Sequence, residues 1–188
     1  LLTLCIFGLI GCSETIQKEN FLVEIRNDTG VISREENPSA IFGSSINGNG
    51  YGIVLSSDTI LTAHHVIPEK KKDIKIVFGE QIHQAKKIKS DEKNDVALLE
   101  TTQKIKGYST AILSSKAPEV GEKVYILQDT QKTGEIIAFS GGLITHTIPL
   151  VPGDSGSPLL NKKGEVIGIN IRAKTDSSLG YARYIGGK

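Results

Sequence analysis

Residues 152–158 of the chain read Pro-Gly-Asp-Ser-Gly-Ser-Pro, so that glycine and proline surround a single central serine, Ser155. Glycine adopts backbone angles that strain other residues, and the chain can therefore turn sharply beside this serine. If the turn directs the N–H groups of Gly153 and Ser155 to one point, they form a two-donor site for an oxyanion. The alternative is an ordinary β-turn, because Gly, Ser, Asp and Pro dominate turns. The rest of the sequence must decide between these two interpretations of residues 152–158.

The composition favours one β-rich unit that does not bind nucleic acid. The 188 residues suffice for a compact unit of ~150 residues plus a tail. Gly occurs 20 times and no long helical period runs through the chain, which indicates many short strands and turns. The 22 basic and 21 acidic residues nearly cancel, so no broad positive field is expected. Cys5 and Cys12 are the only cysteines, and the folded part is predicted to lack a disulfide and a cysteine metal site.

The N-terminal segment predicts a lipid anchor. Residues 1–11 are almost wholly apolar but shorter than the ~20 residues that span a bilayer. They are typical of the apolar core of a signal peptide, and Leu-Ile-Gly-Cys at 9–12 resembles the bacterial lipobox, whose cysteine is lipidated. We therefore expect a lipoprotein signal over residues 1–12 and a tether to a bacterial membrane at Cys12. An ordinary signal peptide or a truncated membrane helix is the alternative.

The residues after the lipobox are polar and mixed in charge. We interpret 13–37 as a tether that includes a lead-in strand or short helix over 21–25. By resemblance to lipoproteins, Ser13 beside the anchor indicates retention in the outer membrane of a two-membrane cell. The folded part is thus expected to lie outside the cytoplasm.

Two further segments carry residues suited to catalysis. Residues 61–66, Leu-Thr-Ala-His-His-Val, place two histidines at the end of a predicted strand, and residues 94–99, Asn-Asp-Val-Ala-Leu-Leu, place Asp95 at the start of an apolar strand. Both patterns also occur for structural reasons alone. A serine hydroxyl, however, needs a base to accept its proton, and the base needs a third group that fixes its tautomer. The chain order histidine, aspartate, serine is that of chymotrypsin rather than subtilisin or the α/β-hydrolases.

These motifs, with Gly-Tyr-Gly-Ile-Val-Leu at 50–55 and Gly-Glu-Val-Ile-Gly-Ile at 164–169, resemble those of bacterial trypsin-like (chymotrypsin-fold) serine proteases related to the HtrA/Deg and glutamyl endopeptidase groups. The resemblance implies an all-β fold of two six-stranded antiparallel β-barrels with the active site between them. We expect the protease domain over 38–188. The first barrel is expected over about 38–106 and the second over about 110–186.

The resemblance also implies a role for each matched residue. The catalytic histidine of the family directly precedes the apolar residue of its motif, which selects His65 and leaves His64 at a variable position. His65 would be the general base, Asp95 would orient it, and Ser155 would be the nucleophile. The N–H groups of Gly153 and Ser155 would form the oxyanion hole. The implied reaction is two-step acyl transfer on protein or peptide substrates, without a metal or other cofactor.

Specificity is expected from a pocket beside the serine loop. By position in the family, its walls are Pro149, Leu150, Ile171, Arg172 and Ala173. Glutamyl endopeptidases carry histidine where this chain has Asn170 and threonine where it has Leu150, so we expect a small or aliphatic residue, not glutamate, before the cleaved bond. His146 could line this pocket, but a structural role is the simpler interpretation, and His83 is expected to lie on the surface.

Animal relatives are activated when a freed Ile-Val-Gly-Gly terminus pairs with the aspartate before the serine. Ile41-Phe42-Gly43 lies too close to His65 for that switch, which leaves Asp154 without an evident partner. The given sequence includes no PDZ-like segment, so it offers no support for an HtrA-style trimer, and the oligomeric state is left open. Two functions remain: a membrane-tethered serine endopeptidase, or a catalytically silent lipoprotein that binds or adheres through the same fold.

Overall fold

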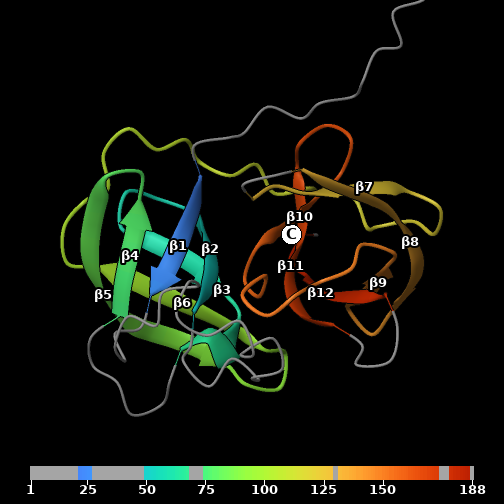
Figure 1. The fold of residues 1–188 in the computed structure, drawn as a ribbon, viewed down its shortest axis with the longest axis horizontal. Helices are drawn as coiled ribbons and strands as arrows, with labels where there is room; N and C mark the ends of the chain where they lie inside the picture. The colour runs from blue at the N-terminus through green and yellow to red at the C-terminus, as the bar shows by residue number, and fades with distance from the viewer. Residues whose placement is uncertain (1–20, 27–48, 68–73, 129–130, 174–177, 187–188) are drawn as a thin grey trace, which may run out of the picture.

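The computed structural model describes residues 21–26, 49–67, 74–128, 131–173 and 178–186, which form two closed six-stranded antiparallel β-barrels (Figure 1). The strands of the first barrel are β1 (Leu22–Arg26), β2 (Gly50–Val54), β3 (Thr59–Thr62), β4 (Ile74–Phe78), β5 (Gln81–Asp91) and β6 (Val96–Thr101). Those of the second are β7 (Lys123–Ile126), β8 (Lys132–Ser140), β9 (Leu143–His146), β10 (Pro158–Leu160), β11 (Val166–Ala173) and β12 (Gly180–Tyr184). The predicted fold class is therefore confirmed.

The two barrels have the same strand order. Going round the first barrel the order is β1-β2-β3-β6-β5-β4, and going round the second it is β7-β8-β9-β12-β11-β10. Closure pairs both sides of every strand, so neither sheet has an open edge. Side chains alternate between buried and partly exposed along β6, as expected for a strand with one face toward a barrel core. The loops that carry the predicted catalytic residues follow strand β3, connect β5 to β6, and follow strand β9.

The first barrel begins earlier than the predicted boundary at residue 38. Strand β1 lies in the segment assigned to the tether, yet it pairs with β2 and with β4 and so closes the barrel. Val23 and Ile25 are each 1% exposed within the core. Their alternation was visible in the sequence, but the pairing partners lie far along the chain and no local signal identifies them. Cys12, the predicted site of the lipid anchor, lies outside the described residues.

His83 is buried, which corrects its predicted surface position. Its side chain is 7% exposed, whereas the neighbouring Ile82 is 66% exposed. The alternation along β5 sets this arrangement, because His83 and Ala85 share the inward face of the strand.

None of the described residues belongs to a helix of the length and apolarity needed to cross a bilayer.

The barrels meet through a shared apolar core. Leu160, Val166 and Ile169 of the second barrel belong to the same cluster of buried side chains as the interior of the first barrel. Two polar contacts reinforce this packing: the N–H of Tyr51 donates to the carbonyl of Ser155 (2.8 Å), and Arg183 Nε donates to the carbonyl of Asn94 (3.1 Å). Each contact joins a loop that carries a predicted catalytic residue to a strand of the other barrel.

Candidate active site

The three predicted catalytic side chains meet between the barrels. His65 Nδ1 lies 2.8 Å from Asp95 Oδ2, and His65 Nε2 lies 2.8 Å from Ser155 Oγ. His65 and Asp95 come from the first barrel and Ser155 from the second. The sequence order had implied such a meeting, and the fold creates it by placing the β3 and β5–β6 loops opposite the β9–β10 loop. The result is one continuous hydrogen-bonded line from carboxylate to imidazole to hydroxyl.

A short 3-10 turn, η2 (His64–Val66), presents His65. It follows β3, and its backbone is closed by bonds from Val66 N to the Ala63 carbonyl (3.2 Å) and from Ile67 N to the His64 carbonyl (3.0 Å). Val66 is 1% exposed and anchors the turn in the core. The imidazole of His65 therefore faces outward, and 36% of its side chain is exposed. A substrate can reach a base held in this way.

Asp95 is fixed in a conformation that few residues adopt. It is the only described non-glycine residue with a positive φ, at 56°. Aspartate tolerates this left-handed region better than most residues, although such strain costs on the order of 1–3 kcal/mol. In return, the Asp95 carbonyl accepts from His64 N (3.1 Å) and its Oδ1 accepts from His65 N (2.9 Å). One residue thus holds both the backbone and the ring of His65.

The electrostatics of this pair set the histidine tautomer. Burial opposes ionisation of Asp95, but hydrogen bonds from the side chain and the backbone of His65 outweigh it and leave the pKa of this carboxyl below its usual value. An ionised carboxylate can only accept a hydrogen bond, so His65 Nδ1 carries the proton of the neutral ring. His65 Nε2 is then left as the acceptor that faces Ser155 Oγ.

Two glycines shape the serine loop for different reasons. Gly156 has φ 83°, and a Cβ atom there would collide with the Tyr51 carbonyl and lie 2.6 Å from Thr62 Oγ1. It therefore permits the close approach of the two barrels. Gly153 has φ 99°, but a Cβ atom there would meet nothing within 4 Å. Position 153 therefore requires glycine only because of its backbone conformation, since there is open space where a side chain would lie.

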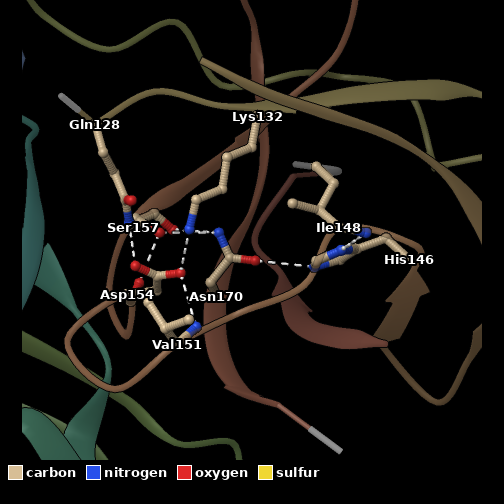
Figure 2. Close-up of polar contacts among 8 residues, drawn as sticks. All are labelled: Gln128, Lys132, His146, Ile148, Val151, Asp154, Ser157 and Asn170. Carbon is tan, nitrogen blue, oxygen red and sulfur yellow. Dashed lines mark hydrogen bonds and ion pairs between the residues drawn. The ribbon is translucent and has the colours of Figure 1, made fainter. Parts of the chain in front are cut away.

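Asp154 has partners that the sequence did not reveal (Figure 2). Its Oδ1 accepts from Gln128 Nε2 (2.9 Å), and its Oδ2 accepts from Lys132 Nζ (2.7 Å) and from the Val151 N–H (2.9 Å). The expectation that Asp154 lacks a partner is therefore wrong. No motif could have shown the contact, because Gln128 and Lys132 lie in a separate polar segment, 26 and 22 residues earlier.

His146 is a buried structural residue, in agreement with expectation. Its side chain is 0% exposed, Nε2 lies 3.0 Å from Asn170 Oδ1, and Nδ1 accepts from the Ile148 N–H at 3.3 Å. Burial lowers the pKa of His146 to about 4, only partly opposed by the bond to Asn170. Asn170 in turn donates to Ser157 Oγ (3.0 Å), so this neutral imidazole supports the end of the serine loop from behind (Figure 2).

The residues predicted to line the specificity pocket occupy two segments. Pro149 is exposed and Leu150 is partly buried against the core of the second barrel. Ile171, Arg172 and Ala173 end strand β11, where Ile171 is buried and Arg172 is exposed. The guanidinium carbon of Arg172 lies 5.2 Å from the ring centroid of Tyr181, a cation–π contact that fixes its position. The pocket itself stays a prediction.

Comparison with known proteins agrees with the fold. Residues 50–169 match the family described as trypsin-like peptidase domain. A probable periplasmic serine endoprotease DegP-like of Pseudomonas putida is 33% identical over 146 residues, which cover 68% of this chain and 30% of that protein. Its counterpart in Ectopseudomonas mendocina is 33% identical over 144 residues, with the same coverage. The chain thus spans about 30% of the length of these relatives.

Solved structures resemble the whole two-barrel unit. The serine endoprotease from Yersinia pestis covers 88% of this chain and 58% of its own, with a TM-score of 0.69 and 24% identity. Rv3671c from Mycobacterium tuberculosis, in an inactive form, covers 88% and 81% with a TM-score of 0.68 and 20% identity. Two closed barrels of this strand order define the chymotrypsin-like fold. Since the family match extends over more than half of the sequence, the chain belongs to the trypsin-like peptidase family.

Proposed function

We propose that the protein is a serine endopeptidase in which Ser155, His65 and Asp95 hydrolyse peptide bonds through an acyl-enzyme. The observation that carries the proposal is the unbroken line of 2.8 Å contacts from Asp95 Oδ2 through the imidazole to Ser155 Oγ. These separations lie within the range that direct proton transfer requires. Family membership supports the same reaction class.

The mechanism follows from the order of these contacts. His65 Nε2 accepts the Ser155 proton as Oγ attacks the substrate carbonyl, and the protonated ring then donates that proton to the leaving amine. Water enters, loses a proton to the same nitrogen and hydrolyses the ester. Asp95 remains ionised throughout, consistent with its lowered pKa, and stabilises the imidazolium. The balance of protons is restored at the end of each cycle.

We assign the oxyanion hole to the N–H groups of Gly153 and Ser155. Within the described part of the chain neither group donates a hydrogen bond, whereas Asp154 N, Gly156 N and Ser157 N on the same loop all do. Two unengaged donors on an otherwise satisfied loop are suited to a developing negative charge. Removal of one such donor typically costs about 2.7–4 kcal/mol of transition-state stabilisation.

Labelling with a fluorophosphonate probe tests the proposal. Such probes phosphonylate an activated serine, so the wild type should be labelled, Ser155→Ala should not, and the exposed control Ser109→Ala should behave as wild type. Mass spectrometry should place the adduct on Ser155. An unlabelled but folded wild-type protein would contradict the proposal and leave the catalytically silent binding protein as the better description.

The substrates are proposed to be proteins or peptides with a small or aliphatic residue before the cleaved bond. Pro149, Leu150, Ile171, Arg172 and Ala173 would form the pocket wall. Profiling against a peptide library measures this preference directly. Strong cleavage after glutamate or arginine would contradict it.

We further propose that the catalytic domain runs from β1 to β12 and is tethered outside the cytoplasm by a lipid on Cys12. The relatives from Pseudomonas putida and Ectopseudomonas mendocina are named as periplasmic proteins, which supports the compartment. Metabolic labelling with an alkyne-tagged palmitate should mark the wild type and Cys5→Ala, but not Cys12→Ala. Equal labelling of all three would exclude Cys12 as the anchor.

A further inference from the structure

We propose that Lys132 is a positioning residue for the reaction: its ammonium group pairs with the buried Asp154 carboxylate and thereby holds the serine loop, residues 151–157, in its reactive shape. The inference rests on the proposed function of Ser155 and concerns a residue that touches neither substrate nor the triad. Lys132 begins strand β8, and its side chain reaches the Asp154 carboxylate (Figure 2).

The first step is the charge of Asp154. Its side chain is 6% exposed, and a carboxylate is costly to bury unless hydrogen bonds and an opposite charge compensate it. Gln128 and the Val151 N–H supply neutral donors, and Lys132 is the cation at 2.7 Å. The lysine side chain is 29% exposed and spans from solvent to the buried carboxylate. One internal side chain thus balances the charge.

Asp154 holds the backbone on both sides of Ser155. Its Oδ2 and its N–H both bond to Val151, at 2.9 and 3.0 Å, which closes the turn before the serine. Its carbonyl accepts from Ser157 N (3.1 Å) and Ser157 Oγ (2.7 Å), which closes the turn after it. Gly153 therefore lies inside the first turn and Ser155 inside the second, and the two turns share Asp154. A displacement of Asp154 would move the nucleophile and both oxyanion donors together.

The backbone at Gly153 is only weakly held. Within the described part of the chain its N–H donates no hydrogen bond, a Cβ atom there would meet nothing within 4 Å, and glycine has no intrinsic preference that would hold its φ at 99°. His65 and Asp95, in contrast, are fixed by the first barrel through contacts that do not involve Lys132. Loss of the lysine should therefore disorder the nucleophile half of the site and leave the acid–base half in place.

An internal cation has a consequence for activation. Because the partner of Asp154 comes from within the chain, the serine loop should take its reactive shape without any cleavage. The species that reacts with a fluorophosphonate probe should accordingly have the mass of the protein after removal of its signal, with no further cleavage, plus one adduct. Labelling confined to a shortened form would overturn this part of the inference.

The decisive experiment is saturable fluorophosphonate labelling of the full chain in wild type, Lys132→Met, Lys132→Arg and the exposed control Lys162→Met. The maximal labelling rate should fall about 100-fold in Lys132→Met, with the half-saturating probe concentration unchanged, since small misplacements of reacting groups cost about this much. Lys132→Arg, which keeps the charge, should fall between Lys132→Met and wild type. In the NMR spectrum, the amide signals of Gly153 and Ser155 should shift in Lys132→Met while the ring signals of His65 remain.

A folded Lys132→Met protein labelled at the wild-type rate overturns the inference but leaves the proposed function intact, whereas an unlabelled wild type overturns both. If Lys132→Met does not fold, the double variant Lys132→Met/Asp154→Asn decides, because it buries no unpaired charge. Folding with labelling about 10-fold slower than wild type supports positioning by the pair. Wild-type labelling of the double variant, or its failure to fold as well, contradicts that role.

Discussion

Asp95 and Asp154 both accept hydrogen bonds from a backbone N–H and from side chains, yet the two carboxylates have different roles. Asp95 accepts from a backbone N–H and an imidazole, and Asp154 from a backbone N–H, an amide and an ammonium group. Their side chains are 25% and 6% exposed. An imidazole gains and loses a proton during catalysis, so its carboxylate partner orients the ring and stabilises the cation that forms. An ammonium group keeps its proton, so its partner can only fix structure. The difference between the roles lies in the partner, not in the carboxylate.

Substituting each aspartate by asparagine gives the largest effect and tests this comparison directly. Asp95→Asn should reduce kcat by about 10⁴-fold, because the amide can no longer fix the tautomer that leaves His65 Nε2 free to accept. Asp154→Asn should reduce kcat by only about 10-fold, because the amide oxygen still accepts from the Val151 N–H. Steady-state kinetics on one peptide substrate measures both. Equal losses in the two variants would show that the aspartates do not have separate roles.

The two glycines of the serine loop extend the comparison from charge to shape. Gly156→Ala combines a positive φ with a collision against the Tyr51 carbonyl and should cost more than about 3 kcal/mol of folding free energy. Gly153→Ala meets open space and should cost only about 1–2 kcal/mol, from its φ alone. Urea unfolding of both variants measures the difference. A smaller loss for Gly156→Ala than for Gly153→Ala would mean that the barrels do not approach through this residue.

The sequence predicts the reacting groups better than it predicts their supports. His65, Asp95 and Ser155 each stand in a local motif whose residue types the chemistry requires, and the family resemblance that these motifs carry implies the two barrels. Lys132 stands in no motif, because a cation that balances a buried charge is defined only by where the chain folds. The same holds for β1, whose partners β2 and β4 are distant, and for His83, whose face is set by the register of β5. Long-range pairing, not local propensity, places these residues.

His146 should make the folded protein sensitive to mild acid. Its pKa is about 4 in the folded protein and about 6.5 when exposed, so the unfolded chain binds a proton first as the pH falls. Stability from this residue is complete above pH 6.5 and is lost between about pH 6.5 and 4, by about 3 kcal/mol in total. Asp95, whose pKa is lowered, loses its contribution in the more acidic range below its ordinary pKa.

Unfolding in urea from pH 7 to 4 isolates this contribution when wild type is compared with His146→Gln. Glutamine can donate to Asn170 but does not titrate, so the variant should have a flatter dependence of stability on pH between 6.5 and 4. Ser109→Ala, which removes an exposed hydroxyl group that does not titrate, is the control and should retain the wild-type slope in that interval. Identical slopes for wild type and His146→Gln would show that the buried imidazole does not titrate in this way.

The smallest expected effect concerns Arg183, which joins the half of the site held by Asp95 to the half held by Asp154. From β12 of the second barrel, its Nε donates to the Asn94 carbonyl (3.1 Å) and its Nη1 to the Gly141 carbonyl (3.1 Å). Asn94 directly precedes Asp95, so the guanidinium joins the loop that carries Asp95 to the barrel that carries Ser155. Arg183→Met should cost about 1 kcal/mol of folding free energy and lower kcat by less than about 10-fold, since a single hydrogen bond is typically worth that much.

Arg26→Met on β1, where the guanidinium pairs with an exposed glutamate, is the matched control and should change neither value. A loss of kcat in Arg183→Met as large as that in Asp154→Asn would mean that the relative placement of the barrels, rather than the shape of the serine loop, limits the reaction.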